Sequence, residues 1–86
     1  MSVVQGYFVD RGKDYMGNHE FVYVYQGPIL SSADFRHHSF ELCEEIYQWS
    51  KMMFGGMKFT YTDFGKCTTF WAVDDQAIMH FKLRYL

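Results

Sequence analysis

This sequence has few of the features that mark the simplest functional classes. It holds two cysteines and one proline in 86 residues, and its formal charge of −2 is close to neutral. Two widely spaced cysteines exclude the dense disulfide scaffold of small secreted proteins. A near-neutral charge provides no general attraction to nucleic acid or to an anionic membrane. No apolar run approaches the roughly 18 residues of a membrane-spanning helix, so we expect no membrane association.

Targeting features are also missing from the beginning of the chain. The first six residues are Met-Ser-Val-Val-Gln-Gly, which provide neither the basic segment nor the apolar core of a secretory signal. We therefore expect a cytoplasmic protein. In a reducing cytosol, Cys43 and Cys67 are expected to be small apolar core residues, and the position of Cys43 on the apolar stripe of the helix predicts an unreactive thiol. Lys66 beside Cys67 would mildly favour the thiolate of that residue.

Aromatic residues are what the chain has in excess, with nine Phe, seven Tyr and two Trp. The hydrophobic fraction of 49% and the charged fraction of 21% indicate a folded core rather than disorder. The length fits a single domain, residues 1–86, and excludes two-domain architectures and large self-contained enzymes. A chain this short hides only about 60% of the surface that its unfolded form exposes, so we expect marginal stability.

Two segments near the N-terminus predict a β-hairpin. Residues 3–10 alternate weakly between two faces, and residues 20–26 alternate strongly between aromatic and β-branched side chains. In the second of these strands the aromatic rings share one face and the valines share the other. The polar residues 11–19 contain two glycines and form the connecting loop.

The middle of the chain predicts the main helix. Apolar residues and one serine recur there at spacings of three and four, which is the helical period. These residues are Leu42, Cys43, Ile46, Trp49, Ser50 and Met53. The helix is expected over residues 39–54 with Ser39 as N-cap, although Ser31 or Ser32 could instead cap a longer helix. A pair of glycines follows residue 54 and supplies the stop.

The last third of the chain predicts a second hairpin and an ambiguous tail. Residues 57–64 and 67–73 alternate as strands, and residues 63–66 form a tight turn between them. The tail fits a short helix over residues 75–81, because an acidic residue can cap it and apolar residues recur at helical spacing. Its alternation of apolar and basic residues fits a fifth strand almost equally well.

The predicted fold class is therefore α+β. We expect a four-stranded antiparallel sheet with one main helix packed on one face, in the order ββαββ, followed by a short C-terminal helix or a fifth strand.

The end of the chain, residues 74–85, resembles the ends of short uncharacterised proteins of tailed bacteriophages. Those proteins often finish with an acidic turn, an alanine, and Phe-Lys-Leu followed by a basic residue and Tyr or Trp. The matching residues are Asp75, Ala77, Phe81, Lys82, Leu83, Arg84 and Tyr85. The resemblance implies a small phage-encoded accessory protein in the cytoplasm of the infected cell. It implies no enzymatic activity and supplies no functional residue.

The usual spacings of metal ligands and catalytic groups do not occur. The neighbouring His37 and His38 point in different directions on a regular element, and no Cys-x-x-Cys or His-x3-His pair is present. There is no Gly-x-Ser-x-Gly nucleophile motif and no glycine-rich phosphate loop. The adjacent Glu44 and Glu45 fit solvation better than acid–base chemistry. We therefore expect no catalytic residue, no metal, no cofactor and no enzymatic activity.

Aromatic residues on a sheet could bind single-stranded nucleic acid by stacking against its bases. Tyr23, Tyr25, Tyr61 and Trp71 would form such a platform. The eight basic residues are outnumbered by ten acidic ones, however, and phosphate neutralisation dominates the affinity of such proteins. Single-stranded nucleic-acid binding is therefore the second hypothesis.

Protein binding is the leading hypothesis, with the same four aromatic residues as anchors. Tyrosine and tryptophan are frequent interface anchors, and one helix can cover only one side of the sheet. Glu41, Glu44 and Glu45 on the water-facing side of the helix would complement a basic surface. In the phage context we expect a non-catalytic inhibitor that occludes a host protein in host takeover or anti-defence, and we also expect self-association into a homodimer.

Overall fold

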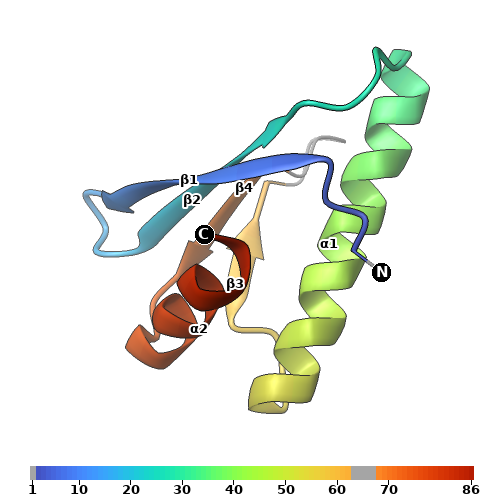
Figure 1. The fold of residues 1–86 in the computed structure, drawn as a ribbon. Coiled ribbons are helices and arrows are strands. Elements are labelled where there is room, and N and C mark those ends of the chain that lie inside the picture. The colour runs from blue at the N-terminus through green and yellow to red at the C-terminus, as the bar shows by residue number, and fades with distance from the viewer. Residues whose placement is uncertain (1, 63–67) are drawn as a thin grey trace.

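The chain folds into a four-stranded antiparallel sheet and two helices (Figure 1). This computed structural model describes residues 2–62 and 68–86. The elements are β1 (Gly6–Lys13), β2 (His19–Tyr25), α1 (Ser32–Phe54), β3 (Phe59–Tyr61), β4 (Thr69–Ala72) and α2 (Asp75–Tyr85). The strands lie in the order β1-β2-β4-β3, and each neighbouring pair is antiparallel. The predicted α+β class is confirmed.

Alternation along the strands gives the sheet two unequal faces. Phe8 lies opposite Tyr23, and Phe21 lies opposite Phe70, so these four buried rings share one side. We call this side the covered face. The other side, which we call the open face, consists of Tyr7, Val9, Glu20, Val22, Val24, Thr60, Thr69 and Trp71.

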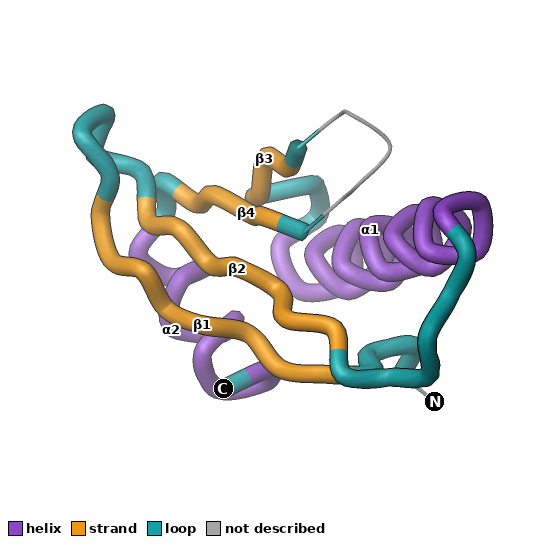
Figure 2. Tube along the Cα trace, turned by 90° about the horizontal axis from the view of Figure 1, so that it is seen from above, coloured by secondary structure: helices purple, strands orange, loops and turns teal. Residues whose placement is uncertain are grey.

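Phe81 of α2 lies at the centre of the core. Its ring centroid lies 4.4 to 5.2 Å from those of Phe8, Phe21 and Phe59, which come from three different strands. Trp49 of α1 contacts the same ring at 6.1 Å and lies 5.9 Å from Phe59. Both helices therefore pack on the covered face, where the sequence had predicted one main helix (Figure 2).

The main helix is the longer of the two alternatives. Ser31 is its N-cap, and the hydroxyl of Ser31 accepts a 3.1 Å hydrogen bond from the Asp34 amide. The expected start at Ser39 is wrong, because Ser39 is buried within the helix. The predicted glycine stop is confirmed, since Gly55 follows the helix with φ of 80°.

The ambiguous tail is the helix α2. The carboxylate of Asp74 caps it by accepting hydrogen bonds from the amides of Gln76 at 2.9 Å and Ala77 at 3.3 Å. Ala77 and Phe81 are fully buried at helical spacing. The fifth-strand alternative is therefore wrong, because the cap and the buried stripe both require the helical period.

β1 begins later than the predicted strand over residues 3–10. The residues before Gly6 run along α1 instead, where the amide of Val3 donates to Glu45 at 2.7 Å. The strand continues to Lys13 with an irregularity between Asp10 and Gly12. The first hairpin is therefore shifted toward its loop.

The second hairpin has shorter strands than predicted. β3 contains three residues and β4 contains four, instead of the expected segments 57–64 and 67–73. The amide of Lys58 donates to the hydroxyl of Ser50 at 3.0 Å, which holds the chain before β3 against α1 rather than in the sheet. The turn predicted over residues 63–66 lies outside the described residues.

Candidate protein-interaction surface

The open face is an apolar surface built from cross-strand pairs. Tyr7 lies opposite Val24, and Val9 lies opposite Val22, so β1 and β2 present two adjacent apolar rows. Trp71 extends this surface onto β4. Tyr7 is 45% exposed, and the other four residues are partly exposed. Because α1 and α2 both pack on the covered face, neither helix shields this surface.

Charge is nearly absent from the open face. Among the described residues with a cross-strand partner on this side, Glu20 alone carries a charge. Its carboxylate accepts a 3.1 Å hydrogen bond from Nε1 of Trp71, which also holds the indole against the sheet. Exposed apolar surfaces with this composition usually mark a site of association.

Two of the four predicted aromatic anchors lie on opposite faces of the sheet. Trp71 lies on the open face, whereas Tyr23 is buried beneath α1. The Tyr23 hydroxyl is 2.9 Å from both the Gln5 amide and Nε2 of His38. Burial raises the pKa of Tyr23. This side chain is a structural link between the sheet, α1 and the N-terminal segment, and it offers no surface to a partner.

The other two predicted anchors also lie away from the open face. Tyr25 is partly exposed, and its hydroxyl donates to the Pro28 carbonyl at 2.5 Å. Tyr61 is 45% exposed at the β3 edge, and its ring lies 6.3 Å from Phe70 of the covered face. The four predicted anchors therefore form no common platform.

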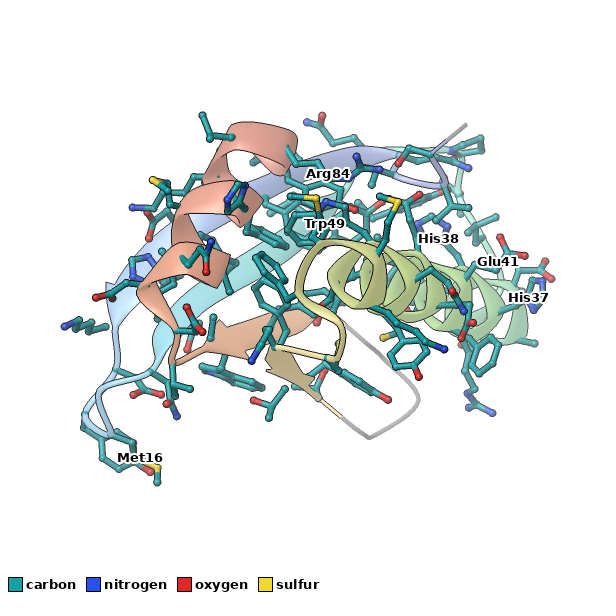
Figure 3. The ribbon with its side chains drawn as sticks, turned by 90° about the horizontal axis from the view of Figure 1, so that it is seen from below. Met16, His37, His38, Glu41, Trp49 and Arg84 are labelled. Atoms are coloured by element: carbon teal, nitrogen blue, oxygen red, sulfur yellow. The ribbon has the colours of Figure 1, made fainter. Side chains whose placement is uncertain are left out.

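Two of the three predicted glutamates are accessible on α1. Glu41 is exposed and its carboxylate lies 2.7 Å from Nε2 of His37. Glu44 is also exposed and accepts a 3.0 Å hydrogen bond from the side chain of Gln48. Figure 3 shows His37 and Glu41 together near the beginning of α1. These carboxylates remain available to a partner.

Glu45 is used within the fold. Its carboxylate accepts hydrogen bonds from the Ser2 hydroxyl at 2.9 Å, the Val3 amide at 2.7 Å and the Tyr85 hydroxyl at 2.9 Å. Burial raises the pKa of Tyr85 to about 12, and the nearby Glu45 carboxylate adds to this effect. The phenol therefore stays protonated and donates. Glu45 joins the N-terminal segment, α1 and α2, so binding a partner would compete with three internal bonds.

The apolar residues of the open face that sequence reasoning missed are Tyr7, Val9, Val22 and Val24. The alternation along β2 had already separated the valines from the aromatic rings. The sequence prediction chose Tyr23 and Tyr25 of this strand as anchors, but Tyr23 is buried in the core beneath the helices and Tyr25 is partly exposed on the covered side.

A cleft of about 320 Å³ lies at the beginning of α1. Its walls consist of Gln5, Tyr25, Pro28, Leu30, Asp34, His37, His38 and Glu41. Several of their polar groups are engaged with one another or with the adjoining core. The His37 ring pairs with Glu41, and the buried His38 ring bonds to Tyr23. The polar side chains of the cleft therefore already bond mostly within the protein, and the cleft is a weaker candidate for a binding site than the open face.

A separate polar cluster joins the first hairpin to α2. Asp10 lies 2.5 Å from Nε2 of His19 and 3.2 Å from Nζ of Lys82, and it accepts a 2.9 Å bond from the Gly12 amide. Burial raises the pKa of Asp10, but its hydrogen bonds to Gly12, His19 and Lys82 outweigh that effect and lower the pKa overall. These contacts connect β1 to β2 and to α2. The described residues contain no group of three or more side chains able to hold a metal ion.

Cys43 lies in the core, but it is disulfide-bonded. The prediction that it is an unreactive free thiol is therefore wrong. The predictions for Lys66 and Cys67 fall on residues outside the described ones. A disulfide is more typical of oxidising compartments than of the cytosol, so this feature does not favour the expected cytoplasmic location.

Comparison with known proteins adds no assignment, because no family model, no curated protein and no solved structure matches the chain. Within residues 2–62 and 68–86, no helix has the length and apolar character needed to cross a membrane. The open face and its contacts are therefore the basis for a functional proposal.

Proposed function

We propose that this protein is a non-catalytic binding protein, and that its contact surface for a partner protein is the open face. The supporting observation is the apolar, nearly uncharged surface around Trp71, which neither helix covers. Tyrosine and tryptophan anchor interfaces well because they bury a large area with few rotatable bonds. Trp71 and Tyr7 fill this role here, and the valines between them provide complementary apolar area.

The finer form of the proposal is a phage-encoded inhibitor of a host protein. It rests on the resemblance of residues 74–85 to the ends of phage proteins, and it places the action in the cytoplasm of the infected cell. A small rigid domain can inhibit by covering a functional surface, so the mechanism needs no catalytic group. The exposed Glu41 and Glu44 would complement basic residues of a partner that also reaches α1.

Affinity capture from host lysate with matched aromatic variants tests the surface. Trp71→Ala is expected to lower the amount of specifically captured protein about tenfold or more, the scale of a central interface anchor. Tyr61→Ala is the control, because Tyr61 is an exposed aromatic residue of the same sheet that lies off the open face. Circular dichroism verifies that both variants fold. Equal capture by folded Trp71→Ala and unaltered protein would overturn the proposal.

A second candidate function is single-stranded nucleic-acid binding by the same surface. Tyr7 and Trp71 are accessible sheet aromatics of the kind on which bases stack. The paired positions of the open face provide no basic side chain to neutralise phosphate, which favours the protein partner. Fluorescence anisotropy with a labelled oligonucleotide separates the two. Binding that weakens steeply with added salt would support this candidate, and no binding at low salt would remove it.

A further inference from the structure

We infer that a second copy of this chain covers the open face at high protein concentration, when no other partner occupies it. The inference rests on the proposed function, because it takes the open face to be a protein-binding surface and names one occupant. Two copies would meet face to face around a two-fold axis, with β1 and β2 of one copy against the same strands of the other. The contact would be isologous, the commonest arrangement of homodimers.

Charge is the first argument for a second copy. In an isologous contact, a charged residue near the two-fold axis lies close to its own symmetry mate, so charges of one sign at the centre of the surface repel each other. The open face avoids this problem, because Glu20 is its one charged residue at a described paired position, and the carboxylate of Glu20 accepts a hydrogen bond from Nε1 of Trp71. A foreign partner could be matched to charge anywhere on the surface, whereas a second copy presents the same charge to itself at the axis.

Shape is the second argument. Val22 lies on β2, an inner strand between β1 and β4, and Val9 lies directly opposite it. The small valine side chains make this part of the face flat, and the larger side chains of Tyr7 and Trp71 lie on the strands to either side. Two such faces can pack at the usual sheet-to-sheet distance of about 10 Å. Each large ring would then cover valines of the other copy.

Area sets the strength of the contact. Four strands spaced about 4.8 Å apart, with roughly five residues each at about 3.4 Å, give a flat area near 330 Å² per copy. Two copies then bury less than the roughly 1,200 to 2,000 Å² of a standard stable interface. The dimer is therefore weak and exchanges readily. A partner with a larger matching surface would displace the second copy, so self-association would mask the open face reversibly.

Sedimentation velocity of the full chain, from about 1 to 500 µM, tests the inference over the range expected for an interface of this size. Unaltered protein is expected to shift from monomer to dimer with rising concentration. Val22→Lys places a charge in the middle of the face and is expected to remain monomeric. Met52→Lys is the matched control, because Met52 is 76% exposed on α1, and it should dimerise like unaltered protein.

A mixed-charge experiment guards against misfolding of the lysine variant. Val22→Glu alone should also be monomeric, and an equimolar mixture of Val22→Lys and Val22→Glu should recover dimer because opposite charges then meet across the axis. If Val22→Lys fails to fold by circular dichroism, Trp71→Thr replaces it with the same expectation. Recovery in the mixture supports face-to-face pairing.

The outcomes separate this inference from the proposed function. Protein that stays monomeric at 500 µM, or a dimer that persists in Val22→Lys, overturns the second copy as occupant. If capture from lysate still depends on Trp71 in that case, the proposed function stands. A dimer that dissociates in Val22→Lys supports the inference, even if Trp71→Ala captures the same lysate proteins as unaltered protein and thereby overturns the foreign partner.

Discussion

Replacing Glu45 by alanine should destabilise the protein much more than replacing its neighbour Glu44. Glu45 accepts hydrogen bonds from the Val3 amide and the Tyr85 hydroxyl, both partly buried, and from the exposed Ser2 hydroxyl. Glu44 is exposed and accepts one bond from a side chain four residues away. The two substitutions change helix propensity equally, so the difference between them isolates the internal contacts of Glu45.

The magnitude follows from the partners that the substitution leaves behind. A hydrogen bond to a charged group contributes about 1.5 to 3 kcal/mol, and a buried donor left unsatisfied costs about 1 to 3 kcal/mol. Water can reach the partly buried donors in the variant, so we expect a net loss near the lower end, about 2 kcal/mol. For a domain of this size that loss corresponds to a fall in Tm of about 8 to 16 °C. Glu44→Ala should change Tm by less than about 4 °C, since exposed substitutions stay within about 0.5 kcal/mol.

Urea denaturation followed by tryptophan fluorescence and thermal melts by circular dichroism measure both variants. The chain has two tryptophans, and Trp49 lies beside Tyr85 at 5.7 Å, so fluorescence reports on the affected region. Glu45→Gln keeps one acceptor oxygen and should fall between alanine and glutamate. Equal stability of Glu45→Ala and Glu44→Ala would refute the assignment of Glu45 to the fold and would return it to the set of partner-facing residues.

Two further predictions concern the helix stop and the acid sensitivity of the fold. Gly55 has φ of 80°, whereas Gly56 does not share this left-handed conformation, and a methyl group at either position would have no other atom within 4 Å. Gly55→Ala should therefore lower the free energy of unfolding by about 1 kcal/mol through backbone strain alone. Gly56→Ala should leave the free energy of unfolding unchanged in the same urea titration. The lowered pKa of Asp10 means that its bonds stabilise the fold fully above the ordinary pKa of 3.8 and that this contribution is lost as pH falls through the folded-state value. Asp10→Asn should therefore lose less stability than unaltered protein between pH 6 and pH 3, about the range around that pKa. An identical loss would contradict the stabilising role of the Asp10 carboxylate.

Some elements could be predicted because their signals are local. The helix stop at Gly55 needs only the residues beside it, and the strong alternation of Phe21 with Val22 needs only the pleat of one strand. The end of the chain was ambiguous because Phe81 satisfies two periods at once. The helix forms because Asp74 caps it and because Phe81 packs against Phe8 and Phe21. Only the cap can be recognised from neighbouring residues in the sequence.

The binding surface was harder to predict because it depends on which side of the sheet the helices cover. The sequence analysis placed Trp71 among the anchors, and this residue does lie on the open face. It also chose Tyr23, which is buried, since aromatic size alone does not tell a core ring from an interface ring. Glu45 was chosen for its charge, but its three donors come from residues about 40 positions away.

The sequence by itself determined the class of this protein: one small α+β domain with a hairpin, a main helix, a second hairpin and more aromatic residues than one helix-covered core needs. Those features follow from local periodicity, caps and composition. Only the tertiary structure decided that α2 joins α1 on the same face, that the aromatic side of β2 turns inward, and that a valine surface around Trp71 is left uncovered. The physical reason is that alternation fixes which residues share a face, whereas packing volume against both helices fixes which face is buried.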